Sequence, residues 1–301
     1  MSSTTFSIVI PTYNAAATLS AALDSILRQR CEDVEVIVVD GASKDDTVNI
    51  ARSYRELSVT VISEPDRGIY DAMNKGIAQA RGDLIGVLGA DDRYKPDALS
   101  LVREARQRST ADIYAGRASL VESTGKSTER LDEEFGVGSL VSGIPFNHNA
   151  MFASSEAYKK IGPYSLKYQI CADAQWVHRA VKAGATCSRI DRVLVEFGMG
   201  GKSSTDATRI MNETFQTIIE NFPFLSLDEA EHIFRTVRGW SDGAQISSIL
   251  ALNSNDKLFL HSVADALLGR LRNSLRPQQQ NIRLTTDGLI QRVRRAFSAS
   301  C

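Results

Sequence analysis

The chain has 301 residues, of which 43% are hydrophobic and 24% charged, and its formal net charge is −1. This composition is typical of a soluble globular protein with a large core, and the length predicts one large domain with an extension, or two domains. The near-zero net charge argues against a general nucleic-acid-binding protein. No apolar run approaches the roughly 20 residues that a membrane-spanning helix needs.

The first fourteen residues carry no basic segment before their short apolar run, so we expect a first strand there and not a signal peptide. The cysteines are scattered without a CxxC pair, and the histidines show no HxxxH or HExxH spacing. This pattern argues against a disulfide framework and a zinc hydrolase. The residues concerned are Cys31, Cys171, Cys187 and Cys301, and His148, His178, His232 and His261.

Residues 5–120 alternate between strand-like apolar runs and helical patterns. Strands are expected at 6–11, 35–40, 59–63, 84–89 and 112–116, and helices at 15–30, 45–56, 71–80 and 96–108. Nearly continuous apolar strands separated by helices predict an α/β fold with a mostly parallel sheet flanked by helices on both faces. Asn14 and Ser43 stand at positions typical of helix N-caps.

The alternation becomes less regular after residue 119. Residues 144–154 read as a loop running into a strand, 172–184 as a helix that ends at Gly184, and 189–204 as a strand followed by a glycine-rich loop. Beyond residue 205 the sequence is helical. We therefore expect a domain over 1–205, divided into halves at 118/119, and a helical C-terminal extension over 206–301.

Four of the expected strands end in polar residues. In an open parallel sheet, ligands bind beyond the carboxyl ends of the strands, so four polar ends on one edge predict a binding site. The residues at these ends are Pro11, Thr12, Tyr13 and Asn14; Asp40 to Ser43; Glu64, Pro65, Asp66, Arg67 and Gly68; and Asp91 with Asp92.

The chemistry that suits these side chains is the binding of a nucleoside diphosphate. Thr12, Tyr13 and Asp40 could hold a base, by stacking and by accepting a ring N–H. Arg67 and Lys75 could face phosphate, although each taken alone is better explained as a solvated surface charge.

Asp91 and Asp92 are adjacent carboxylates that repel each other and need a neutralising partner. Asp91 could take ribose hydroxyls, and Asp92 could bind a Mg²⁺ or Mn²⁺ ion that bridges the phosphates. Such a hard cation needs only one or two carboxylates when phosphate oxygens supply the other ligands. A surface turn is the alternative reading of the same pair.

Three segments together resemble a known family. "SIVIPTYNAAATLSAALDSILRQ", "EVIVVDGASKDDT" and "PDRGIYDAMNKGIAQARGDLIGVLGADD" are similar to family 2 glycosyltransferases, inverting enzymes of the GT-A fold, among them bacterial colanic-acid-type polysaccharide enzymes. The resemblance covers about residues 5–205. It implies a nucleotide-diphospho-sugar donor bound by the strand ends listed above, with Pro11 and Asp66 among them. It also implies a divalent metal at a DXD-like element, here "GADD", which leaves the roles of Asp91 and Asp92 open.

The resemblance also implies a general base at Asp173, in "ICADAQW". Inversion in one displacement needs a carboxylate on the side of the sugar opposite the leaving group, to take the acceptor proton. A carboxylate stabilised by the dipole of its helix is the alternative. His148 is similar to a position that lines the donor or acceptor pocket, or is a structural histidine. Gly200 and Gly201 resemble a glycine-rich loop near the acceptor, or form a surface loop.

Some alternative functions are disfavoured because motifs they require are missing, and one alternative remains open. A sugar-phosphate nucleotidylyltransferase should carry a glycine-rich basic loop where this chain has "PTYN", and a dinucleotide oxidoreductase should carry GxGxxG there. The missing QxxRW motif argues against a processive synthase. A non-catalytic glycosyltransferase-like scaffold remains open. We expect transfer of one sugar, in the bacterial cytoplasm, to a glycan or lipid-linked oligosaccharide of an exopolysaccharide, lipopolysaccharide or capsule.

The C-terminal tail is basic. From Gly269 onward it carries seven arginines against a single acid, Asp287. Apolar residues recur at helical spacing beside three of these arginines, at Leu289, Ile290, Val293 and Phe297. This pattern predicts a basic amphipathic helix that lies on an anionic membrane surface. Packing on the catalytic domain, or on a second copy in a homodimer, is the alternative.

Overall fold

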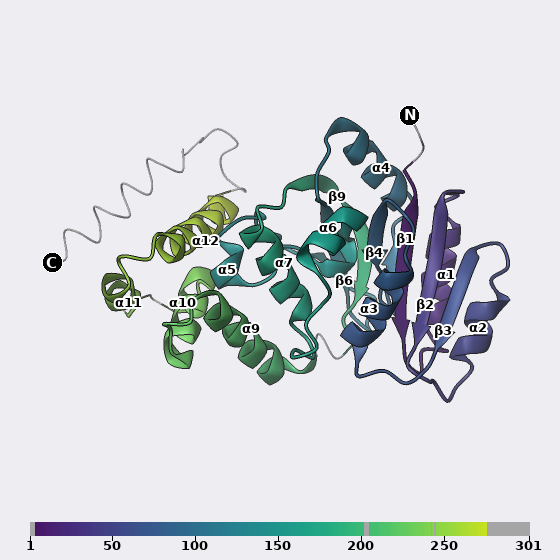
Figure 1. Ribbon diagram of the computed structural model, residues 1–301, viewed down its shortest axis with the longest axis horizontal. Coiled ribbons are helices and arrows are strands. Elements are labelled where there is room, and N and C mark those ends of the chain that lie inside the picture. Colours follow the sequence, from purple (N-terminus) through teal and green to yellow (C-terminus); the bar gives the residue numbers. More distant parts are fainter. Residues whose placement is uncertain (1–3, 202–204, 242, 244, 276–301) are drawn as a thin grey trace. The chain divides into compact units, whose positions relative to one another are not determined.

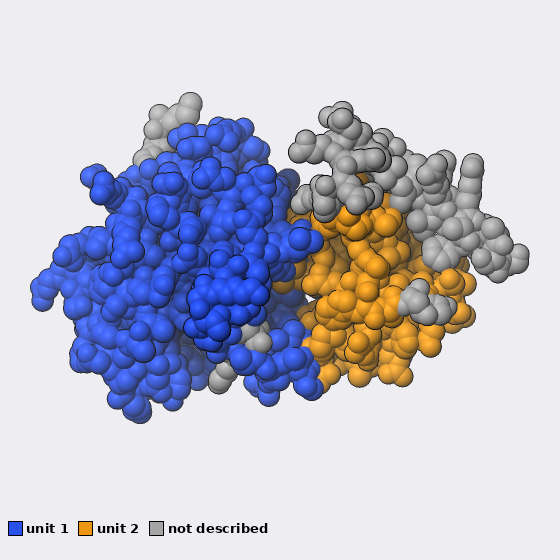
Figure 2. Space-filling model, turned by 180° about the vertical axis from the view of Figure 1, so that it is seen from behind, with its two compact units in different colours: residues 1–132, 146–210 blue, residues 133–145, 211–301 orange. Residues whose placement is uncertain are grey.

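The computed structural model describes residues 4–201, 205–241, 243 and 245–275. The chain forms two compact units, coloured separately in Figure 2. Unit 1 comprises residues 1–132 and 146–210, and unit 2 comprises 133–145 and 211–301. The C-terminal helix expected around 289–297 lies outside the described residues.

The first half of unit 1 is a parallel α/β layer (Figure 1). Its strands are β1 (Phe6–Thr12), β2 (Val34–Asp40), β3 (Ser58–Ser63) and β4 (Leu84–Val87), in the order β3-β2-β1-β4. Its helices are α1 (Leu19–Leu27), α2 (Thr47–Ser53), α3 (Ile69–Gln79) and α4 (Ala98–Arg108). Every residue of β1 is buried, as expected for a central strand that is covered on both faces. The expected α/β fold is confirmed here.

The sheet continues beyond β4 with mixed pairing. The further strands are β5 (Arg93–Tyr94), β6 (Ile113–Val121), β7 (Ser127–Glu129), β8 (Met151–Ser154) and β9 (Cys187–Gly198). β8 is antiparallel to both β4 and β6, whereas β6 and β9 are parallel. The short helices η1 (His148–Ala150) and α6 (Ser155–Ile161) flank β8, and α7 (Ala172–Lys182) precedes β9. The parallel pattern therefore holds for the first four strands, and the second half is mixed.

Neither Asn14 nor Ser43 caps a helix. Thr18 precedes α1 and Asp46 precedes α2, so α1 begins four residues and α2 two residues later than the sequence indicated. Asn14 has a left-handed φ of 50°, and its backbone N–H donates to the Ser43 hydroxyl at 2.7 Å. Short polar side chains compete with helical bonding by binding loop backbone, and here they join the loops that follow β1 and β2.

Unit 2 is helical. It contains α5 (Ser139–Ser142), α10 (Leu227–Arg238), α11 (Ile246–Leu252), α12 (Lys257–Leu275) and most of α9 (Ala207–Asn221). The segment 133–145 groups with these helices: Arg238 pairs with Glu133, and Arg272 pairs with Glu134 at 2.9 Å. The helical character of the extension is confirmed over its described residues. None of the described helices is both long and apolar enough to cross a bilayer.

Candidate active site

The carboxyl ends of β1 and β2 meet at a buried carboxylate. Asp40 is fully buried, and its oxygens accept from the Ser43 backbone N–H at 3.0 Å and the Ser63 hydroxyl at 2.8 Å. The hydroxyls of Ser43 and, at 3.4 Å, Thr12 also donate to it. A buried carboxylate requires such donors. Asp40 thereby holds together the ends of three adjacent strands and the loop after β2.

Tyr13 and Asp66 lie at the same sheet edge. Tyr13 is 65% exposed, which is unusual for a large aromatic residue. The Asp66 carboxylate packs against the backbone of Gly41 and accepts from the Gly68 N–H at 2.8 Å. Asp66 is therefore beside the end of β2, although twenty-five residues separate it from Gly41.

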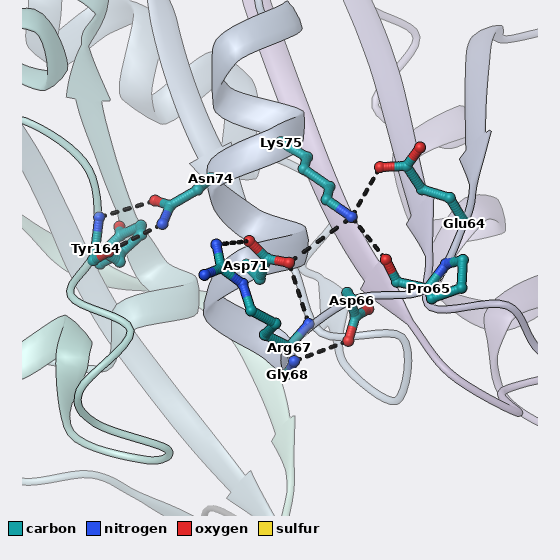
Figure 3. A network of polar contacts seen from close by, with 9 residues as sticks. All are labelled: Glu64, Pro65, Asp66, Arg67, Gly68, Asp71, Asn74, Lys75 and Tyr164. Carbon is teal, nitrogen blue, oxygen red and sulfur yellow. Dashed lines mark hydrogen bonds and ion pairs between the residues drawn. The ribbon is translucent and has the colours of Figure 1, made fainter.

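The two side chains expected to bind phosphate, Arg67 and Lys75, differ in their contacts (Figure 3). Lys75 is tied by Glu64 at 2.8 Å and by the carbonyl of Pro65 at 3.0 Å. The Arg67 side chain is 75% exposed and contacts Asp71 at 3.2 Å. Arg67 is thus available to an anionic ligand, whereas Lys75 organises the loop that precedes α3.

Asp91 and Asp92 have opposite environments at the end of β4. Asp92 is 2% exposed, and its oxygens accept from the Gly198 N–H at 2.8 Å and from the Asn149 amide. Asp91 is exposed, lies beside Gly198, and receives no hydrogen bond from any described residue. Asp92 therefore joins β4 to η1 and β9, and Asp91 presents the open carboxylate.

Burial, and after it the negative charge of Asp91, raise the pKa of Asp92 to about 7. Hydrogen bonds from Gly198 and Asn149 act in the opposite direction. A positive charge placed next to this pair would therefore favour its ionised form.

The open carboxylate of Asp91 is a ligand type that hard cations prefer. Within the part of the chain that the structure describes, no three His, Cys, Asp or Glu side chains form a metal site. A cation at Asp91 would accordingly need most of its ligands from a diphosphate and from water, which suits Mg²⁺ and Mn²⁺.

Asp173 lies in the first turn of α7 and is half-buried. Its Oδ1 accepts from the Tyr70 hydroxyl at 3.1 Å and from the backbone N–H of Ala174 at 2.8 Å. Burial, and then the charge of Asp173, raises the pKa of Tyr70 well above its usual value. Tyr70 therefore stays protonated and acts as the donor.

His148 belongs to an aromatic cluster near Asp173. Its Nε2 lies 2.7 Å from the Tyr164 hydroxyl, which also contacts the Tyr158 hydroxyl at 2.9 Å. Burial lowers the pKa of His148, and the charge of Asp173 only partly opposes this effect. The histidine is therefore neutral at neutral pH, and its neighbour Asn149 carries the contact to Asp92.

The model of the family described as "Glycosyl transferase family 2" matches residues 7–162. The chain belongs to this family. The "PGL/p-HBAD biosynthesis glycosyltransferase" of Mycobacterium tuberculosis is 37% identical over 215 residues, which cover 68% of this chain and 81% of that protein. An "uncharacterized glycosyltransferase" of the same species is 33% identical over 217 residues, covering 67% of this chain and 78% of that protein.

Solved structures share the fold of this glycosyltransferase. TarS of S. aureus in complex with UDP-GlcNAc has a TM-score of 0.60 at 17% identity, covering 87% of this chain and 81% of that one. The mannosyltransferase PcManGT of Pyrobaculum calidifontis, in complex with GDP-Man and Mn²⁺, has a TM-score of 0.57 at 18% identity, covering 93% and 89%. The fold is therefore GT-A, as the sequence resemblance implied.

Gly200 and Gly201 of the glycosyltransferase follow Met199, the first residue after β9. Gly198, the last residue of that strand, contacts both Asp91 and Asp92, so the two glycines lie close in sequence to a residue that touches both acids. Gly200 is exposed. Their expected place near the acceptor stays a prediction.

Sequence reasoning did not single out Tyr70, Asn74 or Asn149. All three lie within stretches that it used, "PDRGIYDAMNKG" and "PFNHNAMF". Helical spacing places Tyr70 and Asn74 on one side of α3 and so provided a signal. Nothing in the sequence indicated that this side faces residues 164–173, or that Asn149 reaches Asp92.

Proposed function

We propose that this glycosyltransferase moves one sugar, with inversion, from a nucleotide-diphospho-sugar to a glycan or lipid-linked acceptor. The observation that carries the proposal is the open carboxylate of Asp91 at the end of β4, at the same sheet edge as Tyr13. An exposed aromatic ring and an open acid on that edge suit the base and the diphosphate of a donor. The UDP-GlcNAc and GDP-Man complexes of the structural neighbours support a donor of this class.

The sequence pattern favoured Asp92 for the divalent cation, Mn²⁺ or Mg²⁺, and Asp91 for the ribose. We propose Asp91 as the first candidate for the cation instead, because Asp92 is 2% exposed and each of its oxygens accepts a hydrogen bond, from Gly198 or from Asn149. A cation held there would offset the charge of the departing diphosphate. Asp92 keeps Asp91 in place through its contacts to η1 and β9. Tyr13 would stack on the base, and Arg67 would reach a phosphate.

Asp173 is the proposed general base. The acceptor hydroxyl would lose its proton to the Asp173 carboxylate while its oxygen bonds to the anomeric carbon. The bond between that carbon and the diphosphate breaks in the same step, and the nucleoside diphosphate leaves with the electron pair. The half-buried position of Asp173 supports this role.

The finer parts of the proposal rest on the sequence. They are a hexosyl or N-acetylhexosaminyl donor, an acceptor in bacterial polysaccharide assembly, a cytoplasmic location, and membrane attachment or dimerisation through the arginine-rich tail. Sedimentation with anionic liposomes, for the full chain and for one ending at Leu275, tests the membrane part. Equal binding of the two chains would contradict it.

The function is tested by the release of nucleoside diphosphate from a panel of nucleotide sugars, with Mn²⁺, with Mg²⁺ and with chelator. We expect metal-dependent release from one donor, and a loss of about 10²–10⁴-fold in Asp173→Asn with donor binding retained. Glu196→Gln is the matched control, because Glu196 pairs with Lys95 at 2.8 Å and not with the site. Absence of release from every donor would favour a non-catalytic scaffold.

A further inference from the structure

Helix α3 is seated rigidly on the sheet. Gly76 lies against β1 and β2, where an added Cβ would clash with Val9 and come within 3.0 Å of Val39 Cγ2. Ala72 and Met73 are also buried. A glycine is less favourable than alanine inside a helix, and here it permits the close approach of helix and sheet. The two remaining sides of α3 are therefore held in a defined orientation.

One of these sides holds the loop that precedes α3, which is part of the proposed donor site. Asp71 accepts from the Arg67 backbone N–H at 3.1 Å and lies 3.7 Å from Lys75, one turn further along the helix. Lys75 in turn binds Glu64 and the Pro65 carbonyl. Figure 3 shows this column of contacts running from the helix to the loop.

The other side holds the segment that leads to Asp173. The single hydrogen of the Tyr70 hydroxyl is shared between two acceptors, the Ile170 carbonyl and, at 3.1 Å, Asp173 Oδ1. One turn later, Asn74 accepts from the Tyr164 backbone N–H at 2.8 Å and donates to the Tyr164 carbonyl at 2.9 Å. Figure 3 shows the Asn74 amide facing the Tyr164 backbone, away from Asp71 and Lys75.

We propose that Tyr70 and Asn74 are positioning residues for Asp173, so that α3 holds the base at a defined distance from the donor loop. The inference rests on the proposed function, since it assigns the carboxylate of Asp173 the role of base. Tyr70 orients that carboxylate directly. Asn74 anchors the start of the segment 164–173.

A positioning element is needed because the proposed base and the proposed donor-binding loop belong to segments about 100 residues apart in the chain. The separation of 103 residues between Tyr70 and Asp173 illustrates this. A misplacement of about 1 Å costs on the order of 10²-fold in rate. Residues i and i+4 of a helix lie on the same side, whereas residues i and i+1 do not. Tyr70 and Asn74 can therefore hold one segment while Asp71 and Lys75 hold another.

A double-mutant cycle tests the inference. We expect Tyr70→Phe to lower kcat by about 10- to 100-fold, the typical effect of losing one hydrogen bond to a charged group, with donor affinity unchanged. Tyr158→Phe is the matched control. It also removes a tyrosine hydroxyl from the aromatic cluster, but the hydroxyl of Tyr158 contacts that of Tyr164 and not Asp173. In the Asp173→Asn background, Tyr70→Phe should cause no further loss, because its effect acts through the missing carboxylate.

The possible outcomes distinguish a failure of this inference from a failure of the proposed function. Wild-type kcat in Asp173→Asn would overturn the proposed base and the inference with it. A strong loss in Asp173→Asn with wild-type kcat in Tyr70→Phe would overturn the inference alone. Equal losses in Tyr70→Phe and Tyr158→Phe, or a full additional loss in the double variant, would show that Tyr70 only stabilises the core.

Asn74→Ala provides a measurement that does not depend on activity. Hydrogen exchange followed by mass spectrometry should show faster exchange in residues 164–173 and unchanged exchange in β1 and β2. Retained protection of 164–173 would contradict the anchoring role of Asn74. This test also covers the case in which Tyr70→Phe folds poorly.

Discussion

At the scale of single residues, the adjacent acids Asp91 and Asp92 have different environments, one exposed and one buried. Asp91→Asn should weaken Mn²⁺-dependent binding of a nucleoside diphosphate by about 10- to 100-fold or more, because it removes the open ligand. Asp92→Asn should retain metal-dependent binding, since Asp92 is 2% exposed and its oxygens face Gly198 and Asn149. Calorimetric titration with and without Mn²⁺ measures both, and the reverse order would assign the cation to Asp92.

His148 should make stability depend on pH. Burial lowers its pKa in the folded state, so at acidic pH the unfolded chain binds a proton that the folded protein excludes. Its contribution to stability is therefore full above the unfolded pKa, near 6.5, and falls as pH drops below that value. We expect the loss of Tm between pH 7 and pH 5 to be smaller in His148→Gln than in the wild type. Parallel Tm curves for the two proteins would show that the imidazole is not responsible.

At the scale of the element, α3 allows its two sides to be tested separately. Asp71 holds the backbone and side chain of Arg67, and Arg67 lowers the pKa of Asp71 by donating hydrogen bonds to it. Asp71→Asn weakens these charge-assisted bonds and should raise the donor KM by about 10-fold, since such a bond contributes about 1.5–3 kcal/mol, while kcat changes little. Steady-state kinetics at saturating acceptor measures this split. A fall in kcat at constant KM would instead link Asp71 to the base side.

At the scale of the whole molecule, the two units interleave in sequence. Residues 133–145 interrupt unit 1 in the chain but pack within unit 2, where Leu140 and Val141 of α5 are fully buried. The Gly138 N–H donates to Asp265 of α12 at 3.0 Å. The helices that bury this segment follow it by some 80 residues or more, as the bond from Asn221 to the Leu140 carbonyl illustrates.

A chain ending at Ile210 should therefore expose α5. We expect stronger binding of a hydrophobic dye and concentration-dependent aggregation, because large apolar side chains and an unpaired Glu133 remain without their helices. A chain ending at Leu275 is the matched control, since it keeps every contact described for 133–145. A monodisperse chain ending at Ile210, with a wild-type Tm, would contradict this dependence.

The sequence by itself determined the fold class and the four parallel strands β1 to β4. The run expected at 35–40 is β2 at Val34–Asp40, because a nearly continuous apolar segment suits a strand that is buried on both faces. The polar strand ends meet at one edge because parallel strands share their direction. Local patterns are sufficient for these features, since each depends on neighbours along the chain.

Only the tertiary structure decided what each polar residue contacts. Asp92 differs from Asp91 because Asn149 and Gly198, separated from it by 57 and 106 residues, donate to its carboxylate. The same applies to Ser43. The sequence pattern predicted a helix N-cap there, whereas in the structure its hydroxyl donates to Asp40. Burial and hydrogen-bond partners of this kind arise from segments brought together by the sheet and by α3, so no local pattern encodes them.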